Sequence, residues 1–209
     1  MGDNPQLITT LTGHTDSIKT IIISSNNQLI ASAGYDNKIK IWTTEGKLLQ
    51  TIDAHNLAIT SLVFTPDSNI LASASWDNTV KLWSINQTGK TSKLLHTLTG
   101  HQDGVTTISL NSQGTLLATG SGDRTIKLWK TKTGQLVKNL RGHTSQINSL
   151  TFSSDDQSII SGEEQQGLYW WNLNLDNLLD RGCDRIADYL TTNPNVKQSD
   201  QKLCQPKTN

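Results

Sequence analysis

The chain has 209 residues, enough for one large domain or two small ones, and its 18 basic residues balance 18 acidic ones. A formal net charge of zero gives no overall electrostatic attraction to nucleic acid or to an acidic membrane. No run of 18 apolar residues indicates a transmembrane helix, and no basic region followed by an apolar stretch indicates a secretory signal, so we expect a cytoplasmic protein. Both cysteines, Cys183 and Cys204, lie late in the chain and do not suggest a disulfide framework.

Short β-branched runs bounded by Gly, Asn, Asp and Pro succeed one another from residue 7 to residue 172, and this pattern is typical of strands. The first run is Leu7–Thr12, and four similar units follow it. In chain order, the strands predicted for these units are Ile18–Ser24, Leu29–Gly34, Lys38–Trp42 and Leu48–Asp53; Ile59–Thr65, Ile70–Ser75, Thr79–Trp83 and Leu94–Thr99; Val105–Asn111, Leu116–Ser121, Thr125–Trp129 and Leu136–Leu140; and Ile147–Ser153, Ser158–Gly162 and Gly167–Trp171.

A His–Trp pair with a constant separation of 28 residues marks each unit. The histidines advance by 41, 46 and 42 residues along the chain. The four pairs are His14 and Trp42, His55 and Trp83, His101 and Trp129, and His143 and Trp171. A period of about 40 to 45 residues indicates a repeat architecture, and four-stranded units of this length stacked around an axis form a β-propeller.

The last part of the chain has a different pattern. Apolar residues at helical spacing between Leu175 and Leu190 predict an amphipathic helix over residues 173–194, ending near Pro194. Residues 195–209 are polar, and we expect them to be disordered.

The repeated motifs resemble those of the WD-repeat β-propeller family. They are Gly13-His14, Ala54-His55, Gly100-His101 and Gly142-His143, with the strand endings Ile41-Trp42, Leu82-Trp83, Leu128-Trp129 and Trp170-Trp171. The segment from Leu71 to Trp83 is similar to the family pattern throughout, and the resemblance covers residues 7 to 172. The tail around Leu175 to Cys183 resembles, more weakly, the tails of bacterial and especially cyanobacterial WD-repeat proteins.

The resemblance implies an all-β fold with four blades, at residues 13–53, 54–99, 100–141 and 142–172. In the family, an N-terminal outer strand completes the last blade and closes the ring, which here assigns residues 7–12 to the fourth blade. Four blades are few for such a ring. The chain therefore either closes as an unusually small ring, pairs with a second copy as a homodimer that completes a larger ring, or belongs to a longer array.

Serine or threonine, histidine, aspartate and tryptophan recur together in the repeats and could be mistaken for hydrolase triads. The family resemblance implies instead a buried hydrogen-bonded tetrad in each blade. This arrangement argues against catalysis, because a nucleophile needs a single exposed site with an oxyanion hole. The tetrad positions are His14, Ser32, Asp36 and Trp42; His55, Ser73, Asp77 and Trp83; His101, Thr119, Asp123 and Trp129; and His143, Ser161 and Trp171. Histidines spaced one per blade do not predict a metal site, and no cofactor is indicated.

The fourth unit departs from the pattern, because Gln165 occupies the position of the aspartate. We expect this blade to have the weakest internal network, either as a degenerate terminal repeat or because Glu163 and Glu164 contribute to a ligand surface. The extra residues of the second unit place Gly89-Lys90-Thr91 at the tip of an enlarged hairpin, which is a further candidate contact.

Partners of the family commonly bind across the rim near the central axis, so the resemblance implies a non-catalytic scaffold for a protein or peptide, with no nucleic acid or membrane partner expected. The rim residues carried over by repeat position are Ser17, Lys19 and Tyr35; Ala58, Thr60 and Trp76; Gly104, Thr106 and Gly122; and Gln146, Asn148 and Glu164. An alternative is the C-terminal sensor part of a larger bacterial signalling protein with an NTPase, kinase or protease region. A stand-alone hydrolase is the third and least favoured hypothesis.

Overall fold

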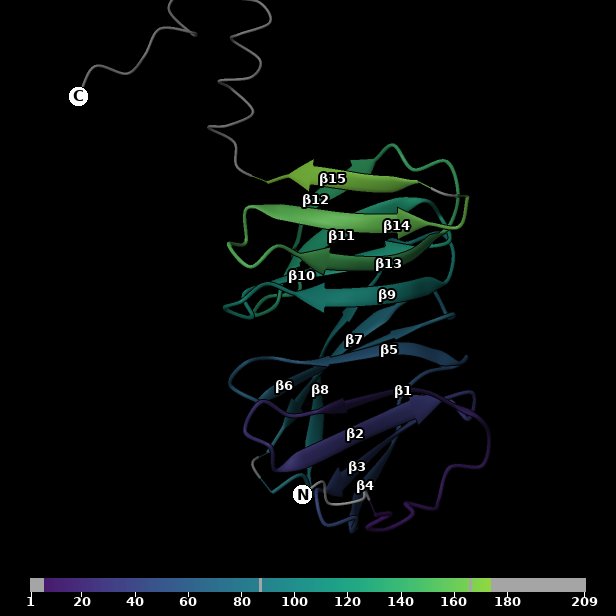
Figure 1. Cartoon of the computed structure of the whole chain (residues 1–209), viewed down its shortest axis with the longest axis vertical. Helices are drawn as coiled ribbons and strands as arrows, with labels where there is room; N and C mark the ends of the chain where they lie inside the picture. Colours follow the sequence, from purple (N-terminus) through teal and green to yellow (C-terminus); the bar gives the residue numbers. More distant parts are fainter. Residues whose placement is uncertain (1–5, 87, 166, 174–209) are drawn as a thin grey trace, which may run out of the picture.

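The computed structural model describes residues 6–86, 88–165 and 167–173, which form fifteen strands in four antiparallel sheets (Figure 1). We call these sheets blades 1 to 4 in chain order. Blade 1 contains β1 (Ile18–Ile23), β2 (Leu29–Gly34), β3 (Lys38–Thr43) and β4 (Leu48–Asp53); blade 2 contains β5 (Ile59–Phe64), β6 (Ile70–Ser75), β7 (Val80–Ile85) and β8 (Ser92–Leu98); blade 3 contains β9 (Val105–Leu110), β10 (Leu116–Ser121), β11 (Thr125–Lys130) and β12 (Leu136–Arg141); and blade 4 contains β13 (Ile147–Phe152), β14 (Ser158–Glu163) and β15 (Leu168–Asn172).

Within each blade the strands pair in chain order, since tight turns join each strand to the next. In blades 1 to 3, the turn between the second and third strands places a non-glycine residue in the left-handed region: Asn37, Asn78 and Arg124 have φ angles of 61°, 67° and 66°. Asparagine tolerates this conformation because its short polar side chain bonds locally, whereas the arginine of blade 3 accepts some strain. Counted from the histidine of each blade, the second and third strands pair in the same register in all four blades.

The blades stack through their first strands, with β1 against β5, β5 against β9, and β9 against β13 (Figure 1). The core is therefore divided into three apolar clusters, each lying between two neighbouring blades. In the cluster between blades 1 and 2, Ile39 and Ile41 of β3 pack with Ile59 and Leu62 of β5. Each blade thus has a front face, which packs on the preceding blade, and a back face, which packs on the following one.

The stack is open in the described residues, because blade 1 and blade 4 lie at opposite ends of the molecule (Figure 1). This arrangement corrects one expectation, because Leu7–Thr12 does not form the outer strand of blade 4. Of the three alternatives for the ring, the described residues do not adopt the small closed one, and the other two stay open. Residues 6–14 form no strand, and the side chains of Thr9 and Leu11 lie beside the β3–β4 turn of blade 1. Blade 4 accordingly has three strands among the described residues.

The helix predicted from the tail and the polar segment 195–209 fall outside the described residues, apart from Leu173. Among the residues that are described, no helix is long and apolar enough to cross a membrane.

Candidate interaction surface

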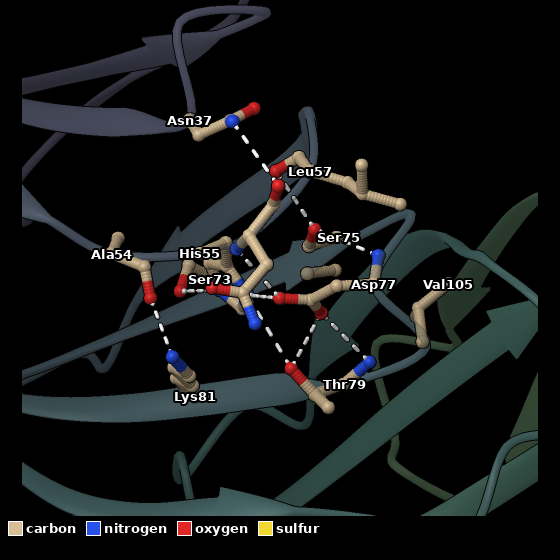
Figure 2. A network of polar contacts seen from close by, with 12 residues as sticks. Asn37, Ala54, His55, Leu57, Ser73, Ser75, Asp77, Thr79, Lys81 and Val105 are labelled. Atoms are coloured by element: carbon tan, nitrogen blue, oxygen red, sulfur yellow. Dashed lines mark hydrogen bonds and ion pairs between the residues drawn. The ribbon is translucent and has the colours of Figure 1, made fainter.

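A hydrogen-bonded tetrad links the outer and inner parts of each blade. In blade 2, the indole Nε1 of Trp83 donates to Ser73 Oγ at 3.0 Å. Ser73 Oγ lies 2.8 Å from His55 Nε2, and His55 Nδ1 lies 2.9 Å from the carboxylate of Asp77 (Figure 2). Because the carboxylate can only accept, the ring proton lies on Nδ1, and Nε2 accepts the hydroxyl hydrogen. Blades 1 and 3 repeat the arrangement with the same atoms, at distances between 2.7 and 3.0 Å.

The aspartate of each tetrad also holds the rim. Asp77 accepts the backbone N–H of Asn56, immediately after the histidine, and both the N–H and the hydroxyl of Thr79 in the following turn (Figure 2). Burial alone would raise the pKa of Asp77, but hydrogen bonds from His55 and Thr79 outweigh burial and hold the pKa well below its usual range. The same causes lower the pKa of Asp123 in blade 3, where His101 is the leading donor. The carboxylates are thus ionised and bind the loops that present the rim.

Glu163 supplies the carboxylate of blade 4, a role that our sequence analysis missed. Its side chain accepts from His143 Nδ1 at 3.1 Å and from the backbone N–H groups of Thr144 and Ser145 at 2.8 and 3.1 Å. Tyr169 donates a further hydrogen bond to Glu163 at 3.2 Å. Burial by itself would raise the pKa of Glu163, but the hydrogen bonds from Ser145 and Thr144 prevail and lower the pKa to about 2.

Blade 4 therefore has a carboxylate acceptor although Gln165 occupies the position of the aspartate, and the expectation that its network is the weakest stays a prediction. Glu163 comes 20 residues after the histidine, whereas the aspartates of the other blades come 22 residues after it. The longer glutamate side chain reaches the histidine from the end of β14, so the repeat spacing could not reveal it. Gln165, at the position of the missing aspartate, instead donates its backbone N–H to Ser145 Oγ.

We expect Glu163→Gln to lower the unfolding midpoint and Gln165→Asp to leave it unchanged. An amide presents one acceptor oxygen in place of two. Its NH2 group would face either the N–H donors of His143, Thr144 and Ser145 or the hydroxyls of Thr144 and Tyr169 that now donate to the second oxygen. Urea unfolding followed by tryptophan fluorescence would measure both variants. A clear gain in stability for Gln165→Asp would contradict the assignment, because it would show that the blade still needs a carboxylate.

The tetrads do not have the geometry of a nucleophilic site. Both ring nitrogens of each tetrad histidine are used within the blade, and Ser73 and Thr119 have no solvent exposure. Four equivalent buried sets fit a structural role, since a nucleophile must meet substrate beside an oxyanion hole. In the described part of the chain, no group of three or more His, Cys, Asp or Glu side chains is placed to hold a metal ion.

In each blade, a backbone hydrogen bond holds the rim residue that comes just before the position of the tetrad aspartate. Tyr35 N–H donates to Ser17 C=O at 2.9 Å, and the same bond recurs at 3.0 Å in the other three blades. The equivalent pairs are Trp76 to Ala58, Gly122 to Gly104, and Glu164 to Gln146. The side chains of Tyr35, Trp76 and Glu164 are consequently presented from a rigid backbone rather than from free loops.

An aromatic pair covers the rim of blades 1 and 2. The rings of Tyr35 and Trp76 meet edge to face with centroids 5.5 Å apart, and the two residues remain 42% and 43% exposed. Trp76 extends over blade 3, where a Cβ added to Gly104 would come within 2.9 Å of its ring. The two aromatic residues therefore form a continuous, partly exposed apolar surface that is held in place by its neighbours.

Some of the predicted rim residues are engaged within the fold. Ala58 and Gly104 are buried, and the hydroxyls of Thr60 and Thr106 donate to carbonyls of the next blade, at Val105 and Ile147. We therefore assign Thr60 and Thr106 to the contacts between blades. The predicted residues that do remain exposed, besides the aromatic pair, are Ser17, Lys19, Gln146, Asn148 and Glu164.

A hollow of about 520 Å³ lies over blade 3, beginning at Gly122 and Asp103 beside the region that Trp76 covers. Arg124 and Arg141 line it together with Asp123. Glycine replaces the aromatic residue at the rim of this blade, and the Asp103 side chain lies against Gly122. The sequence analysis missed these basic residues, since they lie outside the repeat positions carried over from the family.

The enlarged hairpin of blade 2 is not a free tip. Gly89 is buried, and a Cβ added there would come within about 3 Å of Leu29, Ile41 and Leu49 of blade 1. The hairpin thus stabilises the contact between blades 1 and 2, although Lys90 and Thr91 remain exposed.

Comparison with known families gives four matches, all to the family described as WD domain, G-beta repeat. The matched segments are residues 5–43, 46–84, 92–130 and 134–172. None of the curated proteins compared with the chain matches it significantly. The three later segments each begin at or before the outer strand of one blade and end at the third strand of the next, and the first segment ends at β3.

Proposed function

The chain belongs to the WD domain, G-beta repeat family, and on this premise we propose that it is a non-catalytic scaffold that binds a protein or peptide through the rim of blades 1 to 3. The observation that carries the proposal is the Tyr35–Trp76 pair, which exposes apolar rings on a fixed backbone. Tryptophan and tyrosine are the residues that most often dominate binding energy at interfaces. The cytoplasm remains the predicted location, and no cofactor is part of the proposal.

The polar surroundings of the aromatic pair favour a peptide over a nucleic acid. Lys19 and Asp16 lie exposed beside Tyr35 in blade 1, so both signs of charge are present there. On the other side, the hollow of blade 3 combines Arg124 and Arg141 with Asp103. A nucleic-acid backbone would require a uniformly basic groove, and the chain has no net charge. We infer a ligand segment with an apolar anchor on the aromatic pair and polar groups over blade 3.

The test is selection of a displayed random-peptide library against the full chain, followed by fluorescence anisotropy with the selected peptides. We expect Trp76→Ala to weaken binding by tenfold or more, because an interface anchor of this kind contributes about 2 kcal/mol or above. Leu95→Ala, which removes an exposed apolar side chain from the outer strand β8, is the matched control and should bind as the original chain does.

Two results would count against the proposed surface. The first is selection of peptides that bind Trp76→Ala as tightly as the original chain. The second is a selected set whose binding is lost equally in Leu95→Ala, because this would place the contact on the outer strands. Thermal unfolding of both variants separates loss of binding from loss of structure.

A further inference from the structure

Large apolar side chains are exposed at both ends of the stack of blades. The five most exposed large apolar residues of the described chain all belong to these ends: Ile8, Leu7, Leu168, Trp170 and Ile21. Isolated exposed apolar residues are ordinary, but a contiguous patch of this kind marks an interaction surface.

The front face of blade 1 exposes apolar residues whose equivalents are buried or half-buried in the other blades. Ile18, Ile21 and Ile23 of β1 are 53%, 62% and 52% exposed. Their equivalents in β5, which lie at the same distances from His55, are Ile59, Leu62 and Phe64, and these are 0–6% exposed. The difference arises because β5 packs on blade 1, whereas no blade precedes β1 in the described chain.

The back face of blade 4 shows the same contrast. Leu168 and Trp170 of β15 are 78% and 73% exposed. At the same repeat positions, β3, β7 and β11 carry the pairs Ile39 and Ile41, Val80 and Leu82, and Ile126 and Leu128, all at most 3% exposed. Each internal interface of the stack joins one such back face to one front face. The two open ends of the chain are therefore of the two kinds that pack together inside it.

The N-terminal segment Leu7–Thr12 already lies where the outer strand of a preceding blade would lie. In blade 3, the turn glycine Gly134 abuts His96 and Leu98 of β8, which precede His101 by five and three residues. In blade 1, the turn glycine Gly46 abuts Thr9 and Leu11, which precede His14 by the same five and three residues. This segment thus contacts blade 1 as an outer strand does, but it pairs with no sheet among the described residues of its own chain.

In the part of the chain that the structure describes, blade 4 has no fourth strand, which this segment would provide. The third and fourth strands of the complete blades share one register, with Ile39 opposite Ile52, Val80 opposite Leu98, and Ile126 opposite Leu140. Translated by repeat position, the register places Leu168 opposite Leu11, Tyr169 opposite Thr10, and Trp170 opposite Thr9. Leu7–Thr12 and β15 lie at opposite ends of the same chain, so one copy cannot make this pairing in the arrangement described (Figure 1).

We propose that a second copy of this chain binds head to tail, so that Leu7–Thr12 of each copy becomes the fourth strand of blade 4 in the other copy. At each junction, Ile18, Ile21 and Ile23 of one copy pack on Leu168 and Trp170 of the other. An interface that joins two different faces forms a ring if the rotation closes and an open filament if it does not. Two copies give eight blades, within the range of about four to eight that propellers adopt, whereas three copies would exceed it.

A polar contact that recurs between neighbouring blades also supports the pairing of the two end faces. Thr60 and Thr106, five residues after their histidines, donate to the carbonyls of Val105 and Ile147 in the following blade. Asn148 occupies this position in blade 4 and is exposed. Its amide oxygen accepts a hydrogen bond from Gln146, so its NH2 group is oriented for donation elsewhere. In the dimer, this group faces the carbonyl of Ile18 in the second copy.

The first test is the mass of the full chain, measured by light scattering coupled to size exclusion. We expect a single species at twice the 23.0 kDa chain mass. A monomer across the micromolar range would overturn the proposal in favour of further blades on the same polypeptide. A polydisperse series of larger species would overturn the closed dimer in favour of an open array.

Two end-face variants test the head-to-tail arrangement. Ile21→Glu disables the front face and Trp170→Lys disables the back face, and each variant alone should be monomeric. Mixed together, they should form a heterodimer, because the intact front of the Trp170→Lys chain meets the intact back of the Ile21→Glu chain. Val137→Glu, at an exposed position on β12, is the control and should remain a dimer.

If either end-face variant alone retained the full dimer mass, the copies would be joined by two like faces, and the proposal would be wrong. Because Ile21 and Trp170 are exposed within one copy, we expect their variants to fold, which the tryptophan fluorescence spectrum would check.

A cysteine pair tests the exchanged strand directly. Thr10→Cys and Tyr169→Cys, introduced with Cys183→Ser and Cys204→Ser, should form a covalent dimer on mild oxidation, since residues directly opposite on paired strands are close enough for a disulfide. Leu7→Cys with Tyr169→Cys is the out-of-register control and should form much less. A crosslink confined to the single chain would show that the segment closes its own ring, and no crosslink would refute the pairing. Neither result depends on peptide binding at the rim.

Discussion

Replacing Leu82 by alanine is expected to lower the free energy of unfolding by about 2 to 5 kcal/mol. Leu82 lies on the back face of blade 2, has no solvent exposure and belongs to the cluster that joins blades 2 and 3. The substitution removes three carbons and leaves a cavity lined by side chains of two different sheets. Few backbone hydrogen bonds cross this boundary, so the neighbouring blades depend on the cluster for their attachment.

Urea unfolding followed by tryptophan fluorescence and by far-ultraviolet circular dichroism would measure the effect. Leu94→Ala on β8 removes the same atoms at an exposed position and should change stability by at most about 0.5 kcal/mol. If the Leu82 variant were no less stable than this control, the blades would not owe their association to the clusters between them. Separated transitions for the two signals would further show that the stack does not unfold in a single step.

The fold could be predicted from the sequence because every blade repeats the same signals. The His–Trp spacing and the short β-branched runs placed the fifteen strands found, with ends within two residues of those observed. The additional predicted strand, Leu7–Thr12, failed for a physical reason. Its composition is that of an outer strand, but strand formation requires a partner edge, and the edge available in the described chain lies at the far end of the stack.

The candidate surface was less predictable, because the length of each side chain determines whether it bonds within the fold or remains exposed at the rim. Glu163 was not predicted because the carboxylates of the other blades all lie 22 residues after the histidine. A glutamate side chain is longer than an aspartate side chain by one methylene, so Glu163 reaches His143 from a position two residues earlier in the repeat. Thr60 and Thr106 were expected at the rim, yet a hydroxyl at this position can equally reach the next blade. Repeat position identifies which residues approach the rim, but only the packing of neighbouring blades determines which of them remain free.

Replacing Ser73 by alanine is the second large effect, and we expect a loss of about 2 to 4 kcal/mol in the free energy of unfolding. The hydroxyl joins two buried partners: it accepts from Trp83 Nε1 and donates to His55 Nε2. Its removal leaves an indole N–H without an acceptor and a ring nitrogen without a donor, in a site that water does not reach. Each unsatisfied buried group costs about 1 to 3 kcal/mol, which exceeds the value of the bonds themselves.

The chain offers its own matched control, since Thr119 performs the role of Ser73 in blade 3 with the same two partners at 2.8 and 3.0 Å. Ser73→Thr should therefore retain most of the stability that Ser73→Ala loses, although its added methyl must fit a fully buried site. Urea midpoints of the two variants decide the matter, together with the near-ultraviolet circular dichroism of Trp83. If Ser73→Ala kept full stability but abolished an esterase or peptidase activity of the original chain, the hydroxyl would be a nucleophile and the structural role of the tetrads would be refuted.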